Sequence, residues 1–353
     1  MRVLIVGAGP TGLTAAVELA RRGLIAEIVE RREAPSPLSR AVGITPRSLA
    51  ILSPSGAAEA ILREGAPLET ARIHRGARLL FELPARSERA PFPHMIALPQ
   101  DRTEAALLDA LARHGGAVGW GRELAEAREE AGRVVARFAD GGEAAYDLVL
   151  GADGVRSRVR DAAGIAFDGI DLPEEWSIAD VEAAGWPHER AFAIFTGEAG
   201  EIAVVAPLGG GRYRVIADRP GALARLPLKI EATRVRAERS FRISVRQAAR
   251  YEAGRLHLAG DAAHCHSPVG GRGMNLGISD AAAFAEALAA GRLAGWSAAR
   301  HAEGKATIAM TERGRRLMTD PSGFGRARRR LVFAALAALP PLRRRLGRLA
   351  VEL

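Results

Sequence analysis

The sequence predicts an α/β fold with a dinucleotide-binding unit at its start. Three observations support this fold class. Residues 3–6 form an apolar run of strand length that leads into GAGPTG, and a helical pattern follows it. Two later apolar runs, before Gly151 and before Gly260, also end in glycine. Between residues 191 and 218, short alternating runs separated by PLGGGR predict an antiparallel sheet.

The first 30 residues have the pattern of a strand–helix–strand unit. After the strand at 3–6, residues 13–23 show helical periodicity and residues 25–30 predict a second strand. Glu30 ends this second strand, where a carboxylate can accept a hydrogen bond from a ribose hydroxyl. We therefore expect Glu30 and the following Arg31 to contact a cofactor.

The turn between the first strand and the helix supplies the expected phosphate contacts. Gly7 permits a tight turn, Gly9 lets the backbone approach a pyrophosphate, and Gly12 allows close helix packing. Pro10 and Thr11 complete GAGPTG at a helix N-terminus, whose unpaired N–H groups attract an anion. The alternative is a glycine-rich turn that only packs. Because strand, helix, strand and acid follow in register, dinucleotide binding is favoured.

Two further motifs suggest a long cofactor that is contacted at several points. AYDLVLGADGVRSRVR, at 145–160, places a strand before Asp153, and LAGDAAHCHSPVGGRGMNLGISDA occupies 258–281. Taken alone, the Asp-Gly pair is a turn signal and the arginines that follow are a solvated helix start.

Together, the three motifs resemble those of the FAD-dependent aromatic-ring monooxygenases, the class similar to p-hydroxybenzoate hydroxylase. The resemblance runs from Met1 to about Ser279 and includes SRAVGITPRSLAIL and LPQDRTEAALLDAL. It implies a Rossmann-like FAD-binding domain of the glutathione-reductase type, an interleaved antiparallel substrate sheet and C-terminal helices. The implied ranges are 1–70, 98–163 and 250–300 for FAD binding, 71–97 and 164–249 for the substrate sheet, and 301–353 for the arginine-rich helical segment.

The resemblance also assigns cofactor contacts to individual residues. It implies that the Asp261 carboxylate hydrogen-bonds the ribityl chain of FAD and that Gly260, which has no side chain, lets the backbone approach that chain closely. It also implies that the loop beside the isoalloxazine ring leads into a helix at about Met274. A helix start there directs N–H groups at the flavin edge that becomes anionic on reduction. The remaining expected contacts are Arg40, Gln100, Asp153, Asn275 and, in the flavin-proximal loop, Pro268, Gly271, Arg272 and Gly273. No catalytic side chain is assigned.

Arg272 departs from the family, which often has glutamine at this position. A charge so near the expected meeting point of substrate and flavin either selects an anionic substrate or points to solvent; the sequence leaves both open. Arg102 is a weaker candidate for the cofactor site.

A metal site is the rival interpretation of His264, Cys265 and His266. Zinc uses such ligands, but three adjacent residues alternate in direction and the chain has no other cysteine to complete a cluster. We therefore expect no metal, with His264 a structural histidine and Cys265 a buried small hydrophobe.

The resemblance implies an NAD(P)H- and FAD-dependent hydroxylase with noncovalent FAD. NAD(P)H would bind transiently and reduce the flavin, dioxygen would give a flavin 4a-hydroperoxide, and an aromatic, phenolic or polyketide-like substrate would receive one oxygen atom. The alternatives are a flavin-dependent halogenase or another oxidoreductase of the same fold, or a non-catalytic FAD-binding protein. Halogenases need a tryptophan-rich stretch, whereas the four tryptophans here are scattered.

Composition limits the partners and the location. The formal net charge is +9, but eight arginines and no acid lie between Arg326 and Arg348 and nearly account for it. We expect a solvated helical tail there and no nucleic-acid partner. The longest apolar stretch, 331–342, is too short to span a bilayer. A single cysteine and no signal-peptide pattern predict a cytoplasmic protein. It is expected to be a monomer or a homodimer, and the sequence leaves this choice open.

Overall fold

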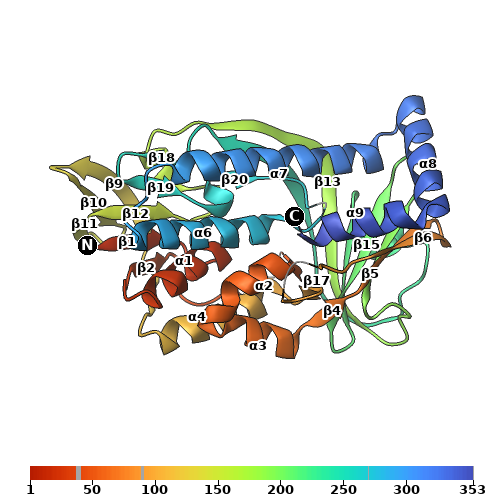
Figure 1. Cartoon of the computed structure of the whole chain (residues 1–353), viewed down its shortest axis with the longest axis horizontal. Helices are drawn as coiled ribbons and strands as arrows, with labels where there is room; N and C mark the ends of the chain where they lie inside the picture. Colours follow the sequence, from red (N-terminus) through yellow and green to blue (C-terminus); the bar gives the residue numbers. More distant parts are fainter. Residues whose placement is uncertain (37–40, 89–90, 269, 353) are drawn as a thin grey trace.

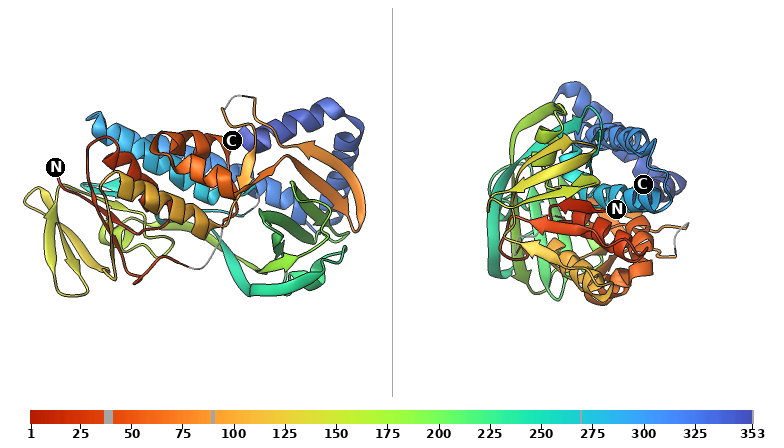
Figure 2. Two further views of the ribbon diagram at one scale, coloured as in Figure 1. Left: turned by 90° about the horizontal axis from the view of Figure 1, so that it is seen from below. Right: turned by 90° about the vertical axis from the view of Figure 1, so that its left-hand side faces the viewer.

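The computed structural model describes residues 1–36, 41–88, 91–268 and 270–352. The molecule is elongated, with the N-terminal strands toward one end and the helix at residues 323–338 toward the other, while the helix at residues 296–319 runs along much of its length (Figure 1). In the end-on view of Figure 2, helices gather on one side and the long strands of an extended sheet on the other.

The dinucleotide unit lies in a six-stranded sheet. The strands, in spatial order, are β18 (Glu252–Ala253), β19 (Leu256–Leu258), β12 (Leu148–Gly151), β1 (Val3–Val6), β2 (Glu27–Glu30) and β8 (Val118–Trp120). All neighbours are parallel except β18 and β19. Helices α1 (Pro10–Ala20), α4 (Gln100–Arg113) and α6 (Gly273–Ala289) pack together beside it. The strands predicted before the three glycine motifs are therefore all present and adjacent.

An eight-stranded sheet forms the second half. Its strands, in spatial order, are β20 (His264–Cys265), β17 (Ala232–Ala248), β13 (Phe167–Ala183), β16 (Arg212–Ala217), β15 (Ile202–Gly209), β14 (Ala191–Thr196), β5 (Thr70–Arg75) and β6 (Arg78–Pro84). PLGGGR forms the predicted hairpin between β15 and β16. Gly209, Gly210 and Gly211 all have positive φ, a conformation that side-chain-bearing residues rarely adopt.

Two smaller sheets and three short helices complete the fold. One three-stranded sheet contains β3 (Gly43–Ile44), β7 (Met95–Ala97) and β4 (Ala66–Leu68), and another contains β11 (Glu143–Tyr146), β10 (Arg133–Phe138) and β9 (Leu124–Glu130). The short helices are α2 (Pro46–Leu52), α3 (Ala57–Glu64) and α5 (Arg158–Ala162). Because β7 pairs with β3, and β20 joins the eight-stranded sheet, the two halves interleave closely. The predicted domain boundaries stay a prediction.

The prediction of a solvated C-terminal tail is wrong for one face of its helices, because that face packs on the eight-stranded sheet. After α7 (Trp296–Thr319), the segment forms α8 (Gly323–Ala338) and α9 (Pro340–Glu352). Phe333 and Leu336 are buried against Ile73 and Phe81, so α8 covers β5 and β6. Even Arg329 is only 4% exposed. Within the described residues, no helix is both long and apolar enough to cross a bilayer.

Candidate cofactor site

The turn between β1 and α1 leaves room for a phosphate group. An added Cβ at Gly9 would meet no atom within 4 Å, whereas one at Gly12 would lie 1.9 Å from the Gly7 carbonyl oxygen. A Cβ on Gly7, where φ is +103°, would lie 2.4 Å from the carbonyl oxygen of Ala152. Helix α1 begins at Pro10 without a side-chain cap. Its first N–H groups are therefore available to an anion.

Glu30 lies beside this turn as an ionised carboxylate. It accepts hydrogen bonds from the Ala8 backbone N–H (2.9 Å) and from Nε of Arg32 (3.0 Å). Burial raises the pKa of Glu30, but these bonds outweigh burial and hold the pKa below its ordinary value. The predicted Arg31 is exposed, so its cofactor contact stays a prediction, whereas its neighbour Arg32 holds Glu30.

Thr11 joins the first glycine motif to the third. A Cβ on Gly260 would lie 2.4 Å from the Thr11 hydroxyl oxygen, and a Cβ on Gly277 would lie 2.2 Å from it. Both positions must therefore be glycine if α1 and α6 are to pack this closely. Most of the chain separates the two motifs, yet they share one site.

A buried charge cluster holds Gly260 in place. Asp280, which is fully buried on α6, accepts hydrogen bonds from the Gly260 N–H (3.1 Å) and Nε of Arg300 (2.7 Å). The Nε2 atom of His264 lies 2.6 Å from the same carboxylate. Burial raises the pKa of Asp280, but His264, Arg300 and the Gly260 N–H together lower it below its ordinary value. The backbone at Gly260, where the ribityl chain is expected to bind, is therefore held in position by the buried Asp280.

Asp261 and Asp153, both predicted cofactor contacts, are placed differently. Asp261 is exposed, and no described residue donates a hydrogen bond to its carboxylate. Asp153 accepts from the N–H groups of Arg158 (2.7 Å) and Val159 (3.2 Å), so it caps α5. Asp261 is free to bind a ligand, whereas Asp153 shapes the second motif.

Arg160 connects the second and third motifs. It is buried, donates to the carbonyl oxygens of Ala262 (3.1 Å) and Val155 (2.9 Å), and lies over the Phe167 ring at 4.0 Å. The interpretation of this arginine as part of a solvated helix start is therefore wrong, because the carbonyls of two loops need a buried donor here.

The loop before α6 is organised by Asn275. The Gly271 N–H bonds the Pro268 carbonyl (2.9 Å), and the Asn275 amide donates to the carbonyls of Gly271 (2.9 Å) and Gly43 (2.8 Å). Its oxygen accepts from the Thr45 N–H at 2.9 Å. Asn275 therefore positions the loop. Gly273 opens α6 as predicted, an added Cβ there would meet nothing within 4 Å, and Met274 packs against the main core.

The structure excludes one of the two expectations for Arg272, that it points to solvent. The side chain is only 4% exposed, and its Nη2 donates to the carbonyl oxygen of Ala350 in α9 at 2.6 Å. Its buried Nη1 has no partner among the described residues, so selection of an anionic substrate stays a prediction.

Of the remaining predicted cofactor residues, the structure describes Gln100 and Arg102 but not Arg40. The Oε1 atom of Gln100 accepts from the Ala41 N–H at 3.1 Å, next to Arg40, which lies outside the described residues. Arg102 pairs with Glu64 through two hydrogen bonds of 2.7 and 2.9 Å at the surface. Gln100 thus orders the backbone beside Arg40, and Arg102 is not brought to the site.

The histidines and cysteine of the third motif have other partners. His264 binds Asp280, and the buried Cys265 thiol contacts the Asp261 carbonyl. Across the part of the chain that the structure describes, no group of three acidic, histidine or cysteine side chains could hold a metal ion.

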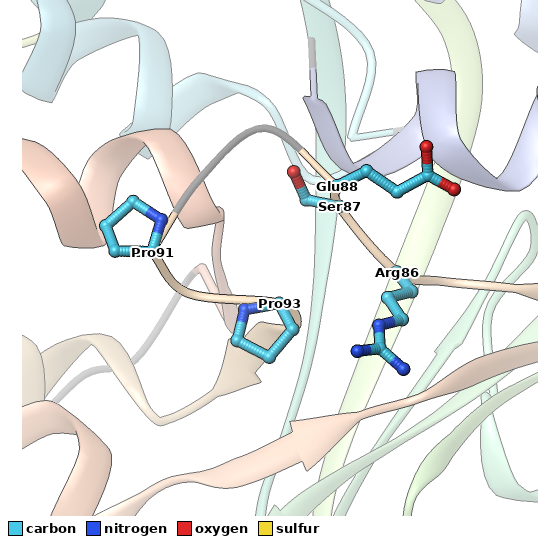
Figure 3. Close-up of a pocket in the computed structure, with 5 residues that line it drawn as sticks. All are labelled: Arg86, Ser87, Glu88, Pro91 and Pro93. Carbon is cyan, nitrogen blue, oxygen red and sulfur yellow. The ribbon is translucent and has the colours of Figure 1, made fainter.

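A cavity of about 660 Å³ lies beside the segment that joins β6 to β7 (Figure 3). Its described lining consists of Arg86, Ser87, Glu88, Pro91 and Pro93.

Sequence reasoning missed Arg32, Arg160, Asp280 and Arg300. One signal was available for Asp280, since it is an acid in the otherwise apolar run NLGISDAAAF of α6. A buried acid of this kind requires partners. The three arginines gave no such signal, because their roles depend on carbonyls and carboxylates distant in sequence.

The residues present fit FAD, with space for a pyrophosphate at Gly9, an acid at the end of β2 and an available carboxylate at Asp261. A family model described as "FAD binding domain" matches residues 1–218 and 223–302. This chain belongs to the FAD-binding-domain family. The family and the fold class predicted from the three motifs are thereby confirmed.

Two curated monooxygenases and one solved structure are similar to this chain. It is 34% identical over 310 residues to 6-methylpretetramide 4-monooxygenase of Streptomyces rimosus, covering 82% of this chain and 55% of that protein. Pentachlorophenol 4-monooxygenase of Sphingobium chlorophenolicum is 34% identical over 312 residues, with coverage of 79% and 56%. The chain thus spans about half the length of these curated relatives. The crystal structure of p-nitrophenol 4-monooxygenase from Pseudomonas putida has the same fold (TM-score 0.88, 24% identity, 99% and 98% covered).

Proposed function

We propose that this protein binds FAD noncovalently and hydroxylates an aromatic small molecule, with NAD(P)H as reductant and dioxygen as the oxygen source. The observation that carries the proposal is the convergence of three distant motifs around Thr11 and Gly260. The names of the matched relatives favour hydroxylation over the halogenase alternative.

Each part of the site would perform one task toward the cofactor. The N-terminus of α1 would hold the pyrophosphate, Glu30 a ribose hydroxyl and Asp261 the ribityl chain. The loop from Pro268 to Asn275 would lie beside the isoalloxazine, where the first N–H groups of α6 would stabilise negative charge. Bound FAD would supply the redox chemistry that activates dioxygen. Only one dinucleotide unit is described, so NAD(P)H would bind transiently.

The inner face of the eight-stranded sheet supports an apolar, planar substrate. Ile194, Val204 and Ile216 are cross-strand neighbours on one face, and all three are only partly buried. Two residues along β15 from Val204, on the same face, Ala206 packs with Val42 beside the cofactor half. An apolar platform facing the flavin would place a ring and exclude water without an acid–base pair.

Two measurements test the proposal. Acid precipitation should release all the flavin as FAD, whereas colour that stays in the pellet, or FMN in the supernatant, would contradict noncovalent FAD. A screen of phenols and polycyclic aromatics should contain compounds that accelerate NAD(P)H oxidation and gain one oxygen atom by mass. FAD binding without such stimulation by any member would support the non-catalytic alternative.

A further inference from the structure

The C-terminal helices expose a stripe of large apolar side chains. On α8, Phe324 and Leu331 are 74% and 73% exposed. They lie seven positions apart, which at about 3.6 residues per turn places them on one face. On α9, Leu342, Leu346 and Leu349 are 41%, 39% and 43% exposed with the same helical spacing. Exposed apolar groups that cluster in this way mark an interaction surface.

Arginines border both stripes. On α8, Arg328 and Arg330 lie on either side of the line through Phe324 and Leu331, and on α9 the leucines lie between Arg343 and Arg345. Arg330 and Arg345 have no hydrogen-bond or ion-pair partner among the described residues, and both are exposed. We call the exposed apolar residues and these arginines the C-terminal surface.

The charge pattern decides which partner this surface fits. No acid lies between residues 326 and 348, so a second copy that docked its own α8 or α9 stripe here would bring arginines against arginines. A nucleic-acid backbone would satisfy the arginines but would leave the leucines without apolar contacts. A bilayer with anionic headgroups offers negative charge at its surface and hydrocarbon just below.

We propose that the C-terminal surface binds an anionic lipid membrane peripherally, with the α8 and α9 apolar stripes entering the headgroup layer. Figure 1 shows α8 at the end of the molecule opposite the N-terminus, so it can reach a planar surface. The same α9 carries Arg348, which pairs with Glu88 at 2.6 Å on the lining of the cavity. The bound face would therefore lie close to that cavity.

Co-sedimentation with vesicles tests this proposal. The full chain should pellet with phosphatidylcholine vesicles that contain phosphatidylglycerol, and binding should weaken about tenfold or more with phosphatidylcholine alone or at high salt. The double variant F324E/L331E should lose binding, and R330Q/R345Q should weaken it and reduce its salt dependence. The matched control I170E/V235E changes residues that are 59% and 50% exposed on β13 and β17, and it should bind like the wild type. Circular dichroism and Tm confirm that each variant is folded.

Several results would overturn the proposal. These are no pelleting with anionic vesicles, equal pelleting with neutral vesicles, or equal loss in I170E/V235E and F324E/L331E. A dimer in light scattering that F324E/L331E converts to a monomer would assign the surface to a second copy. Binding to duplex DNA that exceeds vesicle binding and is lost in R330Q/R345Q but kept in F324E/L331E would assign it to nucleic acid.

Discussion

The guanidinium of Arg272 donates a 2.6 Å hydrogen bond to the carbonyl oxygen of Ala350. Arg272 is the residue that precedes α6, and Ala350 lies in the last turn of α9, so this bond joins the cofactor loop to the C-terminal helix. Burial lowers the pKa of Arg272 to about 10, which leaves it charged at neutral pH. The same Nη2 lies 3.4 Å from the carbonyl oxygen of Leu349, so α9 holds Arg272 through two consecutive carbonyls.

Replacing Arg272 by Gln should lower the free energy of unfolding by about 1–3 kcal/mol, because a charged donor to buried carbonyls is lost. FAD affinity should fall as well, since the loop loses its anchor on α9. Urea denaturation and flavin fluorescence titration measure the two effects. The control Arg292→Gln alters an exposed arginine and should change neither. Equal behaviour of the two variants would show that the Ala350 bond does not order the loop.

Replacement of Gly9 by Ala should mainly weaken FAD binding, whereas replacement of Gly12 by Ala should mainly reduce protein stability. A Cβ at Gly9 meets nothing within 4 Å, so Gly9→Ala should fold with a loss below about 1 kcal/mol, yet it should weaken FAD at least about tenfold by filling the phosphate position. Gly12→Ala places a Cβ 1.9 Å from the Gly7 carbonyl oxygen and should cost at least about 2 kcal/mol of stability. Normal FAD affinity in Gly9→Ala would remove this turn from the cofactor site.

Substitutions of Asp261 and Asp280 should have different effects, the first on FAD affinity and the second on protein stability. Asp261→Ala should keep the wild-type Tm and weaken FAD by about ten- to a hundredfold, because an exposed acceptor is lost. Asp280→Ala leaves Arg300 and His264 without their buried partner and should cost about 3–5 kcal/mol of stability. Asp109→Ala, at an exposed side chain on α4, is the control for both. An Asp280→Ala protein as stable as this control would contradict the anchoring role.

His257 should make the fold sensitive to acid. Its side chain is 3% exposed and packs on Phe284 and Trp296, and burial lowers its pKa to about 4. The unfolded chain takes up a proton near pH 6.5 while the folded chain does not, so stability is complete above about pH 6.5 and falls as the pH drops toward 4. Between about pH 6.5 and 4, the free energy of unfolding of His257→Leu should fall by about 3 kcal/mol less than that of the wild type. Denaturation of both proteins across this pH range measures the difference. Parallel curves would contradict the shifted pKa.

Local patterns predicted the strands, the hairpin at PLGGGR and the start of α6. These features depend on short apolar runs, on two-residue alternation in the hairpin strands and on glycine conformations that the sequence displays directly. Arg272, Arg160 and Asp280 were misjudged or missed for a common reason. Each is a charged side chain whose role depends on partners from distant elements, such as the carbonyl of Ala350 on α9 for Arg272. The local sequence of a charged residue cannot distinguish a solvated position from a buried one with distant partners.

Oxygen-18 labelling tests the proposed hydroxylation most directly. The purified protein is given FAD, NAD(P)H, an aromatic substrate that stimulates NAD(P)H oxidation, and ¹⁸O₂ in unlabelled water. The product should carry one ¹⁸O atom, and EDTA should not change the yield. A product oxygen that comes from water, or activity that disappears with EDTA, would contradict flavin-dependent monooxygenation and return attention to His264, Cys265 and His266.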